Sequence, residues 1–152
     1  MKLSYKQKLF IYFFIVFAVF TVVITFFQQN REKAYKTETL RTTLDDYSDI
    51  IPRYVQQYHL INNGQMDSLK NVLVLMPSNL RLTIVDHDGK VLYDNSLDKE
   101  QGIENHLLRP EIQTALIQKT GTAIRLSKST GVEYYYFAKD YMNYFIRVAL
   151  PY

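Results

Sequence analysis

The feature that most constrains this chain is an uncharged, apolar segment at residues 9–27. As an α-helix this segment would extend about 28 Å, close to the hydrocarbon thickness of a bilayer. The alternative is a cleaved signal peptide, but its apolar region is normally shorter, and no small-x-small cleavage site follows in residues 26–30. A soluble helix would show a polar face, which this segment lacks. The segment therefore predicts an uncleaved transmembrane helix.

Lysines and arginines flank the apolar segment on both sides, so the positive-inside rule alone does not set its orientation. Three lysines precede it, and Arg31, Lys33, Lys36 and Arg41 follow it. Long C-terminal domains are translocated largely regardless of charge, whereas a short lysine-rich tail is usually retained inside. We therefore expect residues 1–8 to be a cytoplasmic tail, residues 9–27 to span the cell (inner) membrane, and residues 28–152 to form one extracytoplasmic domain.

The basic character of the chain belongs to its N-terminal tail. The formal net charge is +3, and Lys2, Lys6 and Lys8 supply all of it, because 15 Lys and Arg balance 15 Asp and Glu in the rest of the chain. A neutral domain without a basic stripe has no electrostatic footprint for nucleic acid, so we expect no such partner. Cysteine is absent, which excludes a disulfide scaffold, thiol catalysis and cysteine-ligated zinc.

An apolar stripe indicates that the chain stays helical beyond the membrane. Its members recur with alternating spacings of four and three residues, at Leu40, Leu44, Tyr47, Ile51, Tyr54 and Tyr58. Pro52 should bend this helix, because proline removes a backbone hydrogen bond. The repeat also fits a dimeric coiled-coil seam, but three repeats are marginal for one, and we expect the stripe to pack on a sheet.

Two shorter helices are predicted further along the chain. Apolar residues at helical spacing cover residues 69–76, until Pro77 ends the run. In the second helix, Pro110 suits the first helical position and Glu111 the positive end of the helix dipole, while Lys119 and Gly121 close the C-terminal end.

Alternating and β-branched residues predict five strands. Residues 82–86 and 91–94 form a hairpin that turns on Asp88-Gly89, and residues 123–127, 133–139 and 144–150 follow as three further strands. Residues 134–137 are aromatic on both faces, so both faces of the sheet need cover. The predicted fold class is α+β: an N-terminal transmembrane helix that continues into a long amphipathic helix, packed on a five-stranded antiparallel sheet.

Three motifs, in this order after the anchor, carry a resemblance that covers nearly the whole chain. They are Val-Asp-His-Asp-Gly-Lys-Val-Leu-Tyr-Asp at 85–94, Asn-His-Leu-Leu-Arg-Pro-Glu-Ile at 105–112 with Ala115, and Ile-Arg-Val-Ala-Leu-Pro at 146–151. The chain resembles the N-terminal part of two-component sensor histidine kinases. The resemblance implies a first membrane helix, an extracytoplasmic PAS-like or Cache-like sensor domain, and a second membrane helix and kinase half beyond Tyr152.

Candidate binding residues gather before the helix at 110 and on the strands that follow it. Asn105, His106, Arg109 and Glu111 place polar groups where an anion such as a carboxylate could meet free backbone N–H groups. Aromatic walls with a few placed polar groups are typical of ligand pockets. The predicted ligand-binding residues are His106, Arg109, Arg125, Tyr134 and Tyr136; the alternatives are loop bracing for Asn105 and His106, a carboxylate pair for Arg109 and core packing for each tyrosine.

The acidic turn Asp86-His87-Asp88 is similar to the opening of a calcium loop, but the spacing fails. Val91 and Leu97 stand where an EF-hand would need Gly and Glu, so we expect a plain hairpin turn, a solvated His87 and no metal. Neither a nucleophile elbow nor a phosphate-cradling loop is present, so no enzyme activity and no cofactor are predicted for these residues.

These features favour signal input as the function. An extracytoplasmic ligand or stress would bias the domain between two arrangements, and the long helix would transmit this conformational change through the membrane. The expected partners are the lipid bilayer, an unknown small ligand, a second copy in a homodimer, and a response regulator through the missing kinase part. The alternatives are the input domain of a chemoreceptor or nucleotide cyclase, and a structural membrane protein such as a pilin, although the Gly-Phe junction and glutamate of pilins are missing near Leu9.

Overall fold

The first element is a long helix, α1 (Tyr5–Gln57), in a computed structural model that describes residues 4–96, 105–127 and 130–152. The chain divides into two units, Met1–Glu38 and Thr39–Tyr152, and α1 contributes to both. In the first unit the apolar side chains of residues 9–27 are almost all exposed. Among the described residues, α1 is the one helix that is long and apolar enough to cross a membrane.

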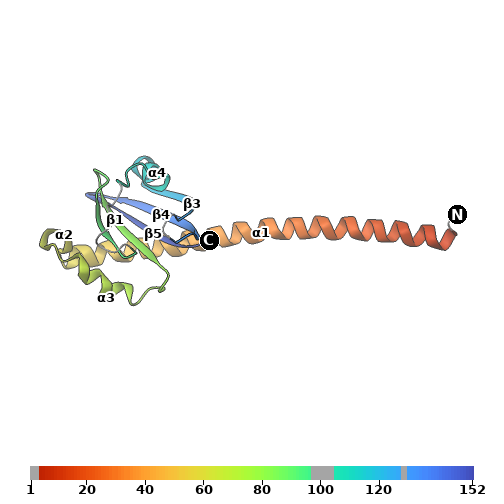
Figure 1. Cartoon of the computed structure of the whole chain (residues 1–152), viewed down its shortest axis with the longest axis horizontal. Helices are drawn as coiled ribbons and strands as arrows, with labels where there is room; N and C mark the ends of the chain where they lie inside the picture. Colours follow the sequence, from red (N-terminus) through yellow and green to blue (C-terminus); the bar gives the residue numbers. More distant parts are fainter. Residues whose placement is uncertain (1–3, 97–104, 128–129) are drawn as a thin grey trace. The chain divides into compact units, whose positions relative to one another are not determined.

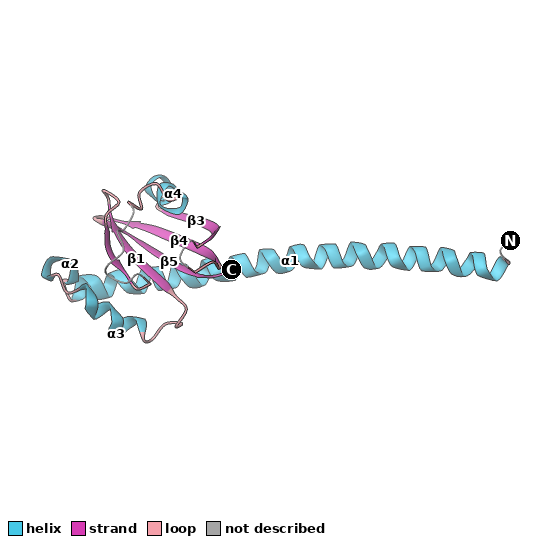
Figure 2. Ribbon diagram, in the orientation of Figure 1, coloured by secondary structure: helices cyan, strands magenta, loops and turns pink. Residues whose placement is uncertain are grey.

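The second unit is built on a sheet of five strands, β1 (Arg81–Asp86), β2 (Val91–Asp94), β3 (Thr120–Leu126), β4 (Glu133–Tyr141) and β5 (Tyr144–Pro151). Figure 1 shows the strands, and their order is β2-β1-β5-β4-β3. Every neighbouring pair is antiparallel. The predicted fold class, α+β with a long N-terminal helix and a five-stranded antiparallel sheet, is confirmed (Figure 2).

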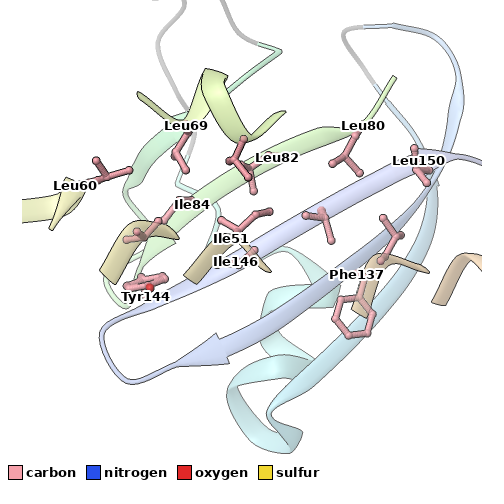
Figure 3. Packing of buried hydrophobic residues seen from close by; sticks show 14 of the residues in the cluster. Ile51, Leu60, Leu69, Leu80, Leu82, Ile84, Phe137, Tyr144, Ile146 and Leu150 are labelled. Atoms are coloured by element: carbon pink, nitrogen blue, oxygen red, sulfur yellow. The ribbon is translucent and has the colours of Figure 1, made fainter. Parts of the chain in front are cut away.

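One face of the sheet packs against the C-terminal part of α1. Leu44 and Ile51 of the apolar stripe are fully buried, and Leu40, Tyr47 and Tyr54 pack against the same cluster. Their partners include Leu82, Ile84, Phe137, Ile146 and Leu150 on the strands, several of which Figure 3 shows. Sheet packing of the stripe, the expectation favoured over a coiled-coil seam, is therefore confirmed. The helix passes through Pro52, which is buried, and continues to Gln57.

The connection from α1 to β1 contains three short helices, α2 (Leu60–Asn63), η1 (Met66–Ser68) and α3 (Leu69–Leu73). The helix expected over residues 69–76 therefore ends three residues early as an α-helix. Its last turn tightens, because the N–H groups of Leu75 and Met76 bond three residues back, to Val72 and Leu73. The apolar residues Val74 and Leu75 are exposed, whereas Met76, after the tightened turn, packs against the same apolar cluster as α1.

The other face of the sheet is covered by α4 (Pro110–Gln118). Ile112 and Ala115 pack on Val85, Ala138 and Phe145 in a second apolar cluster. Pro110 lies at the start of the helix, as predicted, and Lys119 ends it in a left-handed conformation with φ 70°. Gly121 does not cap the helix as expected. It belongs to β3, where a Cβ would lie 2.1 Å from the carbonyl oxygen of Glu111, so its role is to let α4 approach the sheet.

Candidate ligand-binding site

A polar cluster lies on the sheet face that α4 covers. Thr83 on β1 is paired with Arg147 on β5, and Tyr136 on β4 points to the same face because side chains alternate along a strand. Arg125 on β3 is paired with Tyr134 on β4. Four of the five strands therefore bring polar or aromatic side chains to one region of this face.

Glu111 is the centre of the cluster. Its side chain is fully buried, and its Oε1 accepts hydrogen bonds from Nε of Arg147 at 2.8 Å and from a terminal nitrogen of Arg125 at 3.0 Å. Burial alone would raise the pKa of Glu111, but the charges of Arg147 and Arg125 outweigh it and hold the pKa below its usual value. Glu111 is therefore ionised at neutral pH, with two guanidinium groups on one oxygen.

Arg147 extends the network to the far strands. Its other hydrogen bond goes from a terminal nitrogen to Oγ1 of Thr83 at 3.1 Å. Thr83 in turn donates to Oδ2 of Asp94 at 2.9 Å. Only 5 % of Arg147 is exposed, so its positive charge is buried. Two carboxylates compensate it: Glu111 through a direct hydrogen bond, and Asp94 through the hydroxyl of Thr83.

Two tyrosine rings line the cluster beside the arginines. The guanidinium carbon of Arg125 lies 4.0 Å from the ring centroid of Tyr136, and that of Arg147 lies 4.4 Å from it. The ring of Tyr134 is 6.0 Å from that of Tyr136, and Arg81 lies over Tyr134 at 5.5 Å. These are cation–π distances, so the rings compensate part of the desolvation of the arginines.

Three buried polar atoms of this region have no hydrogen-bond partner among the described residues: Oε2 of Glu111, Nε of Arg125 and Nδ1 of His106. Glu111 offers an acceptor and Arg125 a donor. A buried polar atom without a partner costs about 1–3 kcal/mol, so a molecule that supplied the missing bonds would gain affinity from them. A molecule that reached these atoms would have to both donate and accept hydrogen bonds to satisfy them.

His106 lies beside the cluster in the segment that precedes α4. Burial and the positive charges of Arg147 and Arg109 lower its pKa from 6.5 to about 4, so the imidazole is neutral at neutral pH. Its backbone N–H donates to the carbonyl oxygen of Gly89 at 2.9 Å, and the side-chain amide of Asn105 donates to the carbonyl oxygen of Asp88 at 2.8 Å. These bonds brace the segment on the hairpin turn, which was the alternative to ligand binding for Asn105 and His106.

The structure brings three of the five predicted site residues into contact with one another: Arg125, Tyr134 and Tyr136. The charges of Arg147 and Arg109 both lower the pKa of His106, and Arg109 is the residue before the first turn of α4. The binding role of His106 and Arg109 stays a prediction. Sequence reasoning missed Arg147, although an arginine inside the apolar run at 144–150 was a usable signal. It placed Glu111 among the polar groups at the start of the helix but left it out of the predicted ligand-binding residues.

The acidic hairpin turn is stabilised by its own backbone. Oδ1 of Asp86 accepts hydrogen bonds from the N–H groups of Asp88 and Lys90, at 3.0 and 2.8 Å. Nε2 of His87 lies 2.9 Å from Oδ1 of Asp140, and its ring packs edge-on against Phe145. The expected hairpin turn is therefore found, while His87 is paired rather than only solvated. Within the described ranges, no group of three or more His, Asp and Glu side chains could hold a metal ion.

No protein-family model, no curated protein and no solved structure matches this chain. The case for a function rests on its residues and on their geometry.

Proposed function

We propose that this chain is the membrane-anchored signal-input domain of a two-component sensor histidine kinase. In this proposal residues 9–27 span the cell membrane, residues 28–152 lie on the extracytoplasmic side, and the cluster of Glu111, Arg125 and Arg147 binds a small polar ligand. The observation that carries the proposal is the buried cluster itself, with polar atoms that no described residue satisfies.

The two faces of the sheet support a path from such a ligand to α1. Tyr136 and Arg147 belong to the polar cluster, while their chain neighbours Phe137 and Ile146 belong to the apolar cluster that packs on α1. A shift of β4 or β5 on one face therefore changes the packing on the other, because interiors are close-packed. The same helix that receives this packing, α1, also carries the apolar segment.

The available energy is sufficient for a switch. A ligand shifts a two-state equilibrium only through its differential affinity for the two states. Satisfying one buried polar atom in one state and not in the other is worth about 1–3 kcal/mol, which corresponds to a shift of about 5- to 150-fold. One or two hydrogen bonds in the cluster would therefore produce a measurable change in output.

The resemblance described above supplies the rest of the proposal. The active unit is a homodimer in the cell membrane, and its output reaches a response regulator through a kinase half that lies outside these residues. We assign no catalysis to residues 1–152. A chemoreceptor or a nucleotide cyclase would use the same cluster and the same helix, and a structural membrane protein is the remaining alternative.

A chimera tests the proposal. Residues 1–152 replace the input region of a reporter histidine kinase, followed by the second membrane helix of that kinase, and output is compared between defined minimal medium and rich medium. We expect output to differ between the media, and the difference to shrink at least fivefold in an Arg125→Ala chimera but not in a Lys90→Ala chimera. An output that stays constant across media in a chimera correctly inserted in the membrane would overturn the proposal.

A further inference from the structure

A polar contact joins β4 to α1 on the face of the sheet that packs against this helix. Nζ of Lys139 lies 2.7 Å from Oδ1 of Asp45 and 2.7 Å from Oδ1 of Asp49. The hydroxyl of Tyr141, two residues further along β4, lies 2.9 Å from Oδ1 of Asp49 and 2.8 Å from the carbonyl oxygen of Ser48. The Lys139 side chain is only 23 % exposed, so solvent screens this ion pair less than a surface pair.

Along α1, an arginine lies on each side of the two carboxylates that make this contact. Arg41, Asp45, Asp49 and Arg53 are spaced four residues apart, and residues at this spacing lie above one another on one side of a helix. Lys139 binds the two central members. A displacement of α1 by about one turn, roughly 5 Å in either direction, would place Arg53 or Arg41 beside Lys139 in place of one carboxylate.

The apolar contacts of α1 oppose a one-turn displacement only through shape. The stripe alternates spacings of four and three residues, so a helix displaced by one turn would still direct apolar side chains to the sheet, but tyrosines would exchange places with Leu44 and Ile51, which are fully buried. Burial of apolar surface is not directional, and such a change of shape in a core costs about 1–3 kcal/mol. The charges add a repulsion to this cost.

We propose that Lys139 is a positioning residue that holds α1 in one axial register on the sheet, by binding Asp45 and Asp49 and by repelling Arg41 and Arg53 in the two neighbouring registers. The consequence for signalling rests on the proposed function: α1 responds to a ligand by tilting or rotating about this contact, and does not slide by a full turn.

The test measures the register directly and needs neither a kinase nor a ligand. The full chain has no cysteine, so Ile50→Cys on α1 and Met142→Cys on the turn after β4, both at exposed positions, carry spin labels in lipid nanodiscs. Electron-spin distance measurements should give one label–label distance for the otherwise unchanged chain. The conservative Lys139→Arg variant should keep it.

Two variants are designed to release the register. Lys139→Glu would be repelled by Asp45 and Asp49 and attracted by Arg41 and Arg53, so the label–label distance should shift or split by up to about 5 Å. Lys90→Glu, the same charge change at an exposed position, should leave the distance unchanged. The double variant Arg41→Asp, Arg53→Asp keeps the Lys139 contact but makes both neighbouring registers acceptable, so its distances should spread over more than one value.

The double arginine variant decides the matter even where Lys139→Glu does not fold. A single, unchanged distance in that variant overturns the proposal, because the flanking repulsion would then have no effect. Such a result leaves the signal-input proposal standing, since that rests on the chimera alone. A silent chimera with the expected distances would instead overturn the signal-input proposal and keep the register proposal.

Discussion

Nε of Arg147 donates a 2.8 Å hydrogen bond to Oε1 of Glu111, and both side chains are buried on the sheet face that α4 covers. Arg147 comes from a central strand and Glu111 from the first turn of α4. The pair therefore ties the helix to the sheet at the point where the candidate ligand would bind, and the stability of the domain and the state of the site depend on the same contact.

Removing the charge of Glu111 should destabilise the domain strongly. In Glu111→Gln the size of the side chain is kept, but Arg147 and Arg125 lose the carboxylate that compensates them. Breaking a buried ion pair from one side costs about 3–5 kcal/mol. The free energy of unfolding, measured by urea denaturation of the full chain in detergent micelles, should fall by that amount. Glu133→Gln, at an exposed position of β4, should change it by less than about 0.5 kcal/mol, and equal losses in the two variants would contradict the prediction.

Stability should fall as the pH decreases from 6.5 towards 4. The pKa of His106 is lowered from 6.5 to about 4 in the folded chain, chiefly by burial, so below pH 6.5 the unfolded chain binds a proton that the folded chain does not. This titration lowers the free energy of unfolding by at most about 1.4 kcal/mol for each pH unit in this window. Glu111, whose folded pKa is also lowered, contributes stability that is lost only as the pH falls below its ordinary value of 4.5.

Unfolding curves at half-unit steps of pH would check this dependence. The His106→Gln variant should show a flatter profile between pH 5 and 6.5, while His59→Asn, which changes an exposed histidine, should keep the slope of the unchanged chain. A slope that His106→Gln leaves intact would assign the titration to another group.

Gly89 should be far less replaceable than Gly131. Both have positive φ, 83° and 66°, so alanine is strained at either position. A Cβ at Gly131 would meet nothing within 4 Å, whereas a Cβ at Gly89 would lie 2.0 Å from Oδ1 of Asn105. Displacing Asn105 would break its bond to Asp88 and loosen the segment before α4. We expect Gly89→Ala to cost about 1–3 kcal/mol more than Gly131→Ala, measured as the difference between their free energies of unfolding.

The fold could be predicted because its signals are local. The stripe from Leu40 to Tyr58, the Asp88-Gly89 turn and the alternating strands each identify an element within a few residues. The sequence misplaced what depends on packing between elements. Gly121 was expected to end a helix, and only the close approach of α4 to β3 explains it. Likewise α3 ends at Leu73 although Met76 still packs on the core, so apolar spacing alone does not give the end of this helix.

The candidate site could be predicted only in part, for the same reason. Arg125, Tyr134 and Tyr136 lie on strands that are consecutive in the chain, so strand alternation suffices to group them. The pair of Glu111 and Arg147 depends on the strand order and on where α4 crosses the sheet. The contact between Lys139 and α1 joins residues 90 or more positions apart, and no spacing in the sequence indicates it.

The orientation in the membrane rests on a balance of sequence rules and has a direct test. The chain has no cysteine, so a single introduced cysteine reports its own side of the membrane. Met142, which is 93 % exposed on the turn after β4, and Ser4 in the short lysine-containing tail are suitable positions. Because the long C-terminal part is expected outside and the tail inside, a membrane-impermeant maleimide should label Met142→Cys on intact cells and Ser4→Cys only after lysis. Labelling of Ser4→Cys on intact cells, with Met142→Cys protected, would place the candidate site in the cytoplasm and remove the basis for an extracytoplasmic ligand.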